Sequence, residues 1–489
     1  MIPKAFPMKM TQSAVPRAMM VAFLATAIML VQALAAQARP DSFADLAEQI
    51  SPSVVNITTS TVVEGRTGPQ GIVPEGSPFE DFFREFQDRQ GNNDRPRRTS
   101  ALGSGFVISA DGYVVTNNHV IDGADEILIE FFEGEELPAK VIGTDPNTDI
   151  ALLKVESDEP LKFVEFGDSD TARVGDWVLA MGNPLGQGFS VSSGIVSARN
   201  RALSGSYDDY IQTDAAINRG NSGGPLFNMN GDVIGVNTAI LSPNGGSIGI
   251  GFSMASNVVT RVVEQLQEYG ETRRGWLGVR IQNVTEDMVE AVDGLEAASG
   301  AMVTDVPEGP AMEAGMKAGD VIMTFDGANV ADVRALVRRV GNTTVGKAVD
   351  VVVLRGGEEV TLQVTLGRRE EAEGAVPASQ PAPEVEDEPV EKELLGLTLA
   401  PLNDALREEL GVDGDLDGLV VKSVDETSKA YEKGLRAGDV LTEASHQKLR
   451  SVGDFEARID EVREAGRKSV LLLVRRAGEP RFVALSIEE

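Results

Sequence analysis

A serine in a glycine-rich turn is the strongest chemical signal in this chain of 489 residues. The string Gly220-Asn221-Ser222-Gly223-Gly224-Pro225 leads into an apolar run. A serine hydroxyl becomes a useful nucleophile when a base takes its proton and backbone N–H groups face the developing oxyanion. Gly220 lets the chain bend, so that its N–H and that of Ser222 point into one concavity, with the N–H of Asn221 as a further candidate. A short Gly-x-Ser-Gly string alone favours an ordinary loop, so the prediction depends on finding a base.

The base must be one of two histidines, His119 or His446. His119 follows an apolar, strand-like run and precedes a predicted turn, whereas His446 has no partner string and is expected to be a surface residue. A carboxylate that fixes the histidine tautomer would complete the site. Asp149 opens an apolar run, where a carboxylate is costly without a partner. Asp145, which precedes a proline in a predicted turn, is the alternative.

The chain order His119, Asp149, Ser222 is that of chymotrypsin-like enzymes and differs from the order in subtilisins and α/β-hydrolases. The strings around these residues resemble the HtrA/Deg (peptidase Do) family of serine endopeptidases. Further strings carry the same resemblance, at 103–106, 182–184 and 249–252. The resemblance runs from about residue 42 to the C-terminus. It implies His119 as general base, Asp149 as its orienting residue and Ser222 as nucleophile, with no cofactor.

Short strands alternating with turns from 101 to about 257 favour two packed six-stranded β-barrels. We therefore predict a mainly β protein, with a chymotrypsin-like double-barrel protease domain at 39–272 closed by a helix at 258–272. Residues 64–100 break the pattern and contain four phenylalanines in a polar segment. This segment is either a hydrophobic satellite cluster or, as the resemblance implies, a loop that regulates access and supports oligomer assembly.

An internal repeat follows the predicted protease domain. Residues 277–281 match 395–399, and residues 315–322 match 434–441. Each copy resembles an α+β PDZ domain, which predicts domains at 273–369 and 394–489, separated by an acidic Pro/Glu-rich linker at 370–393. Backbone N–H groups of the first copy are expected to bind a peptide carboxylate, while the adjacent strand edge pairs with the peptide. The residues predicted for this loop are Trp276, Leu277, Gly278 and Val279.

The two copies differ at one turn. Residues 443–447 replace the Phe325-Asp326-Gly327 turn of the first copy. Equal peptide binding by both copies is therefore not expected.

Composition excludes several classes of function. The formal net charge of −32 argues against a nucleic-acid partner, since binding would require neutralising phosphates. The chain has no cysteine, which excludes disulfides, a thiol nucleophile and Cys-ligated zinc, and its two histidines lie in different predicted domains, so no metal site is expected.

The first 38 residues resemble a secretory signal peptide, with three basic residues, an apolar stretch and a cleavage site ending at Ala38 or Ala35. An uncleaved anchor is the alternative. The predicted location is the periplasm, with no membrane span after cleavage.

The resemblance also implies specificity and regulation. Ile217, with Leu241 as a second candidate, would line a small apolar pocket that favours Val, Ile, Leu or Ala before the cut. Arg201 aligns with a loop arginine that senses the neighbouring PDZ domain, and a solvated surface arginine is the equal alternative.

The predicted function is an ATP-independent endopeptidase that degrades unfolded or damaged proteins in envelope stress and is activated by C-terminal peptides. The expected assembly is a homotrimer or a multiple of it. The alternative is a PDZ chaperone or adaptor with secondary or no proteolysis.

Overall fold

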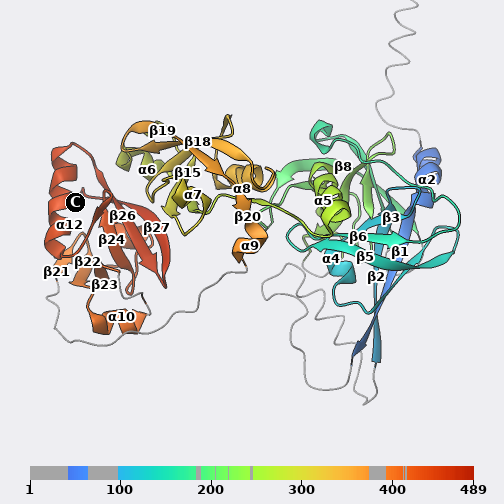
Figure 1. Ribbon diagram of the computed structural model, residues 1–489, viewed down its shortest axis with the longest axis horizontal. Helices are drawn as coiled ribbons and strands as arrows, with labels where there is room; N and C mark the ends of the chain where they lie inside the picture. Colours follow the sequence, from blue (N-terminus) through green and yellow to red (C-terminus); the bar gives the residue numbers. More distant parts are fainter. Residues whose placement is uncertain are drawn as a thin grey trace, which may run out of the picture.

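The computed structural model describes residues 42–63, 97–182, 189–203, 205–218, 220–242, 246–373, 392–410, 412 and 416–488. The predicted signal peptide, most of the segment predicted as a regulatory loop and most of the linker lie outside these residues. Figure 1 shows three units in a row, with the second PDZ module separated from the barrels by the first. Among the described residues, no helix is both long and apolar enough to cross a membrane.

The first barrel closes in the order β1-β2-β3-β6-β5-β4. The tight turn around Gly112, whose φ is +99°, joins two of its strands, with Phe106 paired to Val115. Alternate side chains of these strands fill the interior, as in the pattern of β4, where Ile127 and Ile129 are buried. Its strands are β1 Val54–Val63, β2 Arg97–Val107, β3 Tyr113–Thr116, β4 Glu126–Glu130, β5 Glu136–Asp145 and β6 Ile150–Val155.

The second barrel closes in the order β10-β11-β12-β9-β8-β7. One core cluster joins the two barrels, since Phe106 and Leu152 of the first pack with Leu179 and Phe227 of the second. The barrels are therefore fixed to each other by buried apolar surface. The strands are β7 Trp177–Gly182, β8 Ser190–Arg201, β9 Tyr210–Thr213, β10 Pro225–Phe227, β11 Val233–Ile240 and β12 Gly251–Ala255.

Helix α5 (Ser256–Tyr269) packs on this shared core. Its buried residues Val259, Val262, Val263 and Leu266 recur at helical spacing, so one face is apolar. The helix ends at Gly270, which takes the left-handed conformation (φ +73°) common at helix C-termini. The shorter helices of this unit are α2 Ala44–Ile50, η1 Ser51–Ser53, α4 Asn118–Ile121 and η2 Ser169–Thr171.

The first PDZ module has the sheet order β14-β15-β16-β18-β19, with β17 paired to β16 and a separate β13-β20 pair. Its strands are β13 Gly275–Trp276, β14 Arg280–Asn283, β15 Ala301–Asp305, β16 Val321–Phe325, β17 Ala328–Asn329, β18 Ala348–Arg355, β19 Glu358–Thr365 and β20 Gly367–Arg368. Its helices are α6 Glu286–Ala291, α7 Pro310–Glu313, α8 Val333–Gly341 and α9 Arg369–Glu373.

The second PDZ module repeats this arrangement with the sheet order β21-β22-β23-β24-β26-β27, and β25 paired to β24. Its strands are β21 Lys392–Leu394, β22 Leu397–Pro401, β23 Leu419–Val424, β24 Val440–Ala444, β25 Gln447–Lys448, β26 Ser469–Arg476 and β27 Glu479–Ser486. Its helices are α10 Asp404–Leu410, α11 Lys429–Glu432 and α12 Val452–Glu464.

Two predicted irregular segments are shorter than expected. Residues 97–100, predicted as loop, belong to β2, where they pair with the end of β1. Residues 370–373 of the predicted linker are helical in α9, and residues 392 and 393 are strand in β21. Both differences arise from partners elsewhere in the chain, which composition alone does not reveal. The mainly β fold with two closed barrels agrees with the prediction.

Candidate active site

His119 and Asp149 form a hydrogen-bonded pair at one end of the first barrel. His119 lies in α4, directly after β3, and Asp149 directly precedes β6. The distance from His119 Nδ1 to Asp149 Oδ2 is 2.6 Å, and the His119 backbone N–H donates to Asp149 Oδ1 at 2.9 Å. Because an ionised carboxylate only accepts hydrogen bonds, this contact assigns the proton to Nδ1 and leaves Nε2 able to accept one.

The backbone of Asp149 is also held in place. Its φ of +57° lies in the left-handed region, which aspartate tolerates better than most residues. Its carbonyl accepts hydrogen bonds from the backbone N–H of Asn118 (3.0 Å) and the side-chain amide of Asn117 (2.8 Å). Four hydrogen bonds therefore fix Asp149 to the segment that carries His119.

The turn with Ser222 belongs to the second barrel but packs on the first. The Ser104 N–H donates to the Ser222 carbonyl at 2.9 Å, and the Ser104 hydroxyl donates to the Gly220 carbonyl at 2.5 Å. A Cβ on Gly223 (φ +83°) would lie 2.2 Å from the Ser104 carbonyl oxygen and from Thr116 Oγ1. Only glycine allows this approach. The serine turn thus meets the end of β3, three residues before His119.

The backbone N–H groups of the serine turn are not equivalent. The Asn221 N–H donates to the Asn218 carbonyl at 3.1 Å, so it is engaged within the loop. Within the described residues, the N–H groups of Gly220 and Ser222 donate to no protein acceptor. Of the three candidates for oxyanion donors, the geometry therefore leaves Gly220 and Ser222 and removes the Asn221 N–H.

Asp145, the alternative carboxylate, has a different partner. It is 1% exposed and forms a bidentate ion pair with Arg274, whose Nη1 lies 3.0 Å from Asp145 Oδ1. The Thr148 hydroxyl donates to the same carboxylate at 2.5 Å. Asp145 thus fixes the turn before Asp149 and does not contact the histidine ring through any of these bonds.

The two residues predicted for the specificity pocket lie beside the start of β12. Ile217 is buried, and a Cβ on Gly251 would lie 2.8 Å from its Cγ1. Leu241 is 59% exposed, and its N–H donates to the Ile250 carbonyl at 3.1 Å. Only Ile217 contributes to the apolar interior at this position.

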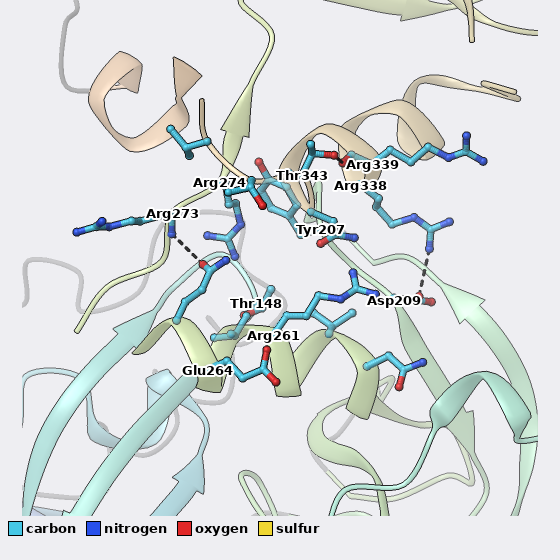
Figure 2. Close-up of a pocket in the computed structure, with 18 of the residues that line it drawn as sticks. Thr148, Tyr207, Asp209, Arg261, Glu264, Arg273, Arg274, Arg338, Arg339 and Thr343 are labelled. Atoms are coloured by element: carbon cyan, nitrogen blue, oxygen red, sulfur yellow. Dashed lines mark hydrogen bonds and ion pairs between the residues drawn. The ribbon is translucent and has the colours of Figure 1, made fainter. Parts of the chain in front are cut away.

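Arg201 lies at the exposed end of β8, where its Nε donates to Gln212 Oε1 at 3.2 Å. Residues 207–209, which follow in the chain, contact α8 of the first PDZ module. Arg338 of α8 pairs with Asp209 at 3.2 Å, and Arg334 donates to the Asp208 carbonyl at 3.4 Å. Figure 2 shows Arg338 pointing towards Asp209. Both residues line a cleft of about 620 Å³.

Tyr207 was not predicted as a functional residue. The Arg274 guanidinium lies 4.4 Å from the centroid of its ring (Figure 2). Gly341 of α8 lies against the edge of the same ring. The acidic pair that follows Tyr207 in the chain and the arginine-rich α8 were visible in the sequence as separate features. Their complementary charge was the available signal, although no local pattern connects them.

The predicted carboxylate-binding loop of the first PDZ module borders a small groove of about 70 Å³. Gly278 has a φ of +81°, which allows the loop to turn tightly. Tyr207 of the protease unit and Arg369 also line this groove. The other lining residues are Gly275, Trp276, Leu277, Gly278, Val279, Ile281, Leu336, Val337 and Val340.

Family models match both parts of the chain. Residues 103–236 match the trypsin-like peptidase domain, and residues 246–366 match the PDZ domain. A probable periplasmic serine endoprotease, DegP-like, from Bartonella henselae is 42% identical over 461 residues, which covers 91% of this chain and 89% of that protein. Its counterpart in Brucella suis is 41% identical and covers 91% of this chain and 90% of that protein.

The chain belongs to the DegP-like periplasmic serine endoproteases. This confirms the predicted family, the serine endopeptidase class and the periplasmic location.

The solved structures support the same assignment. The HtrA-type protease AlgW with a decapeptide is 39% identical, with a TM-score of 0.56, and covers 67% of this chain and 99% of that chain. A serine-to-alanine variant of AlgW with a decapeptide is 38% identical, with a TM-score of 0.57, and covers 70% of this chain and 100% of that chain. The predicted double-barrel fold followed by PDZ domains is therefore confirmed in this DegP-like protein.

Proposed function

We propose that this DegP-like protein is an endopeptidase for unfolded or damaged periplasmic proteins, with Ser222 as nucleophile, His119 as general base and Asp149 as its orienting residue. The observation that carries the proposal is the junction of the barrels. There the 2.6 Å His119–Asp149 pair and the Ser222 turn are fixed to the same strand end, β3.

The chemistry follows from the proton positions. The Nδ1–H of His119 donates to Asp149, so Nε2 accepts the Ser222 proton as the hydroxyl oxygen attacks the scissile carbonyl. The N–H groups of Gly220 and Ser222 would stabilise the resulting oxyanion. The imidazolium then protonates the leaving amine, and water attacks the acyl-enzyme with His119 again acting as base.

Specificity would depend on an apolar pocket at Ile217. Its aliphatic side chain offers no charge to a substrate lysine or arginine. We therefore expect cleavage after Val, Ile, Leu or Ala, with Leu241 contributing from the exposed side. A mass-spectrometric digest map dominated by cleavage after Lys or Arg would contradict this assignment.

Activation would come from a C-terminal peptide in the groove of the first PDZ module. AlgW was solved with a decapeptide, which supports peptide recognition in this family. Tyr207 lines the groove and belongs to the protease loop after Arg201, so a bound peptide can bias that loop if its affinity differs between two loop conformations. Arg201→Ala should reduce stimulation without weakening peptide binding if Arg201 relays the signal.

Casein digestion by the purified full chain tests the core of the proposal. Ser222→Ala, which removes one oxygen, should abolish cleavage and leave the unfolding temperature unchanged. His119→Ala should be nearly as damaging, because triad residues act as a unit. Wild-type digestion by Ser222→Ala would disprove the assignment.

Retained suppression of aggregation without any cleavage by wild type would favour the chaperone or adaptor alternative. The proposed assembly is a homotrimer or a multiple of it, to which the loop at 64–100 would contribute. Sedimentation of the full chain tests it.

A further inference from the structure

The two PDZ modules carry corresponding residues in the same elements. Leu395 and Gly396 of the second correspond to Leu277 and Gly278 of the first. The buried side chains of α12, Phe455 and Ile459, occupy the places of two groove residues of α8, Leu336 and Val340. A groove between a strand edge and a helix is therefore encoded in both modules.

In the first PDZ module, the segment before the loop leaves the groove open. Strand β13 pairs with β20, so that Gly275 lies opposite Arg368 and Trp276 opposite Gly367. Strand β14 pairs with β15 and, within the described residues, has no strand on its other edge. That edge is available to pair with an added peptide strand.

In the second PDZ module, the corresponding segment pairs with the groove strand itself. Residues 392–394 form β21, which is antiparallel to β22, and Leu394 lies opposite Leu397. Because β23 pairs with the other edge of β22, both edges of this strand are occupied. A free peptide therefore has no hydrogen-bonding edge on β22 while β21 is in place.

The side chains of this segment also contact the groove. Leu394 and Leu395 are partly buried and pack on the core cluster that includes α12. Lys392 Nζ lies 2.6 Å from Glu456 Oε1 on α12, and Glu456 stands where the first module has Val337. We refer to residues 392–394, which form β21 and precede the loop residues Leu395 and Gly396, as the internal strap.

We propose that the second PDZ module has a latent site for an extended peptide with a free C-terminal carboxylate, and that the internal strap occupies it. The inference rests on the proposed peptide recognition by the first module, but not on proteolysis. The ligand class follows from the corresponding loop, strand edge and helix in the two modules.

The turn that follows the strap explains why the site can open. Leu395 has a φ of +52° and Gly396 of +75°, whereas the corresponding Leu277 has a negative φ and only Gly278 is left-handed. A left-handed backbone is unfavourable for leucine, since its Cβ approaches the following carbonyl oxygen. Release of the strap would relieve this strain. The exposed Lys392–Glu456 pair, 53% and 37% exposed, is a contact that can be removed without altering the core.

Fluorescence anisotropy tests the proposal in the full chain with Ser222→Ala, which prevents cleavage of the probe. The probe is a labelled decapeptide that ends in valine with a free carboxylate, and its C-terminal amide is the control ligand. Val337→Trp fills the first groove, which measures only about 70 Å³, and should weaken binding at least tenfold. Adding Lys392→Glu places like charges at positions 392 and 456. This change should raise the affinity for the peptide probe at least tenfold above that of the blocked variant.

Matched variants identify the cause of any recovery. Adding Glu456→Lys to Val337→Trp/Lys392→Glu re-forms the ion pair with reversed charges and should abolish the recovery. Glu393→Lys, in place of Lys392→Glu, changes an exposed neighbour in the same strand and should leave binding weak. The amide probe should bind tightly to none of the variants.

Hydrogen exchange of the β22 amides completes the test, with Val337→Trp/Leu394→Pro as a second release variant that lacks one strap N–H. Exposed β22 amides without recovery of peptide binding would overturn the latent site. The role of the strap would be overturned if the β22 amides stayed protected in both release variants. It would also be overturned if these amides were already unprotected in the protein with an unchanged strap. If the Ser222→Ala parent binds neither probe, the proposed peptide recognition fails instead.

Discussion

The first PDZ module contacts its two neighbours through surfaces that differ in their buried parts. Towards the protease unit it presents arginines, of which Arg274 pairs with buried Asp145 and Arg338 with Asp209. Towards the second PDZ module it presents a buried apolar cluster, with ion pairs such as Arg280–Glu479 in addition. The cluster comprises Val284, Met288, Ala291, Val292, Leu295, Met302, Val321 and Leu354 of the first module, with Leu471, Leu473, Phe482 and Ala484 of the second.

This difference indicates which contact is suited to change. Apolar burial is non-directional and tolerates small shifts, whereas ion pairs depend on geometry and are weakened by salt. The protease contact also includes Tyr207, which lines the peptide groove. We therefore expect the two PDZ modules to move together and the contact with the protease unit to be the adjustable one.

The largest effect is expected from Arg274→Ala. It leaves the carboxylate of Asp145 buried without its partner, which costs about 3–5 kcal/mol in comparable sites. Chemical denaturation should show this loss in the protease unit, together with lower kcat, because Asp145 fixes the turn before Asp149. Arg273→Ala is the matched control, since its ion pair with Glu271 is exposed and 3.5 Å long. Equal effects of the two changes would contradict the special role of the buried pair.

The apolar contact should appear in a double-mutant cycle. Leu354→Ala and Leu473→Ala remove side chains from one cluster across the two modules, so their effects on unfolding free energy should be non-additive by about 0.5–3 kcal/mol. Leu472→Ala is the control, because the adjacent side chain points into the core of the second module. Coupling of Leu354 to Leu472 as strong as that to Leu473 would refute a shared interface.

Local strings and periodicity predicted the parts of the molecule that are encoded by neighbouring residues. The serine turn, the strand before His119 and the repeat of the two modules are of this kind. The Arg274–Asp145 pair is not, because its partners are 129 positions apart and each resembles a surface charge.

The engaged N–H of Asn221 and the pairing of β21 with β22 also escaped prediction. The Asn221 contact depends on a hydrogen bond to Asn218 within an irregular loop. The strand pairing depends on where the segment before the carboxylate-binding loop goes, since β13 pairs with β20 in the first module and β21 pairs with β22 in the second.

Salt should weaken the contact with the protease unit more than the contact between the PDZ modules, and this effect should be smaller than those of the substitutions. Raising ionic strength from 0.1 M to 1 M shortens the Debye length from about 10 Å to about 3 Å, which weakens partly exposed pairs such as Arg338–Asp209. Such pairs contribute about 0–1 kcal/mol each, so the change is modest. Hydrogen exchange should accelerate at residues 207–209 and remain constant at Phe482. Faster exchange at Phe482 alone would show that the contact between the PDZ modules, and not the contact with the protease unit, is the salt-sensitive one.

The smallest effect is expected from pH, and its sign should differ between the two contacts. Burial raises the pKa of Asp209, against the opposing effect of Arg338. Desolvation by the surrounding protein lowers the pKa of His446, although the residue remains exposed to solvent, against the opposing effects of Glu443, Asp320 and Asp293 and together with Arg467. His446 abuts Gly319 of the first module and lies 6.0 Å, between ring centroids, from Phe482.

The signs follow from which state binds protons more readily. A docked carboxyl with a raised pKa binds protons better than an undocked one, so acidification favours docking to the protease unit as pH falls towards the carboxyl range. A docked histidine with a lowered pKa resists protonation, so docking of the PDZ modules weakens as pH falls below the ordinary histidine value of about 6.5. Hydrogen exchange between pH 7 and 5, corrected for intrinsic rates, should therefore rise at Phe482 and not at residues 207–209. His446→Asn, which suits the φ of +62°, should remove the rise at Phe482, and an unchanged rise in that variant would assign it to another group.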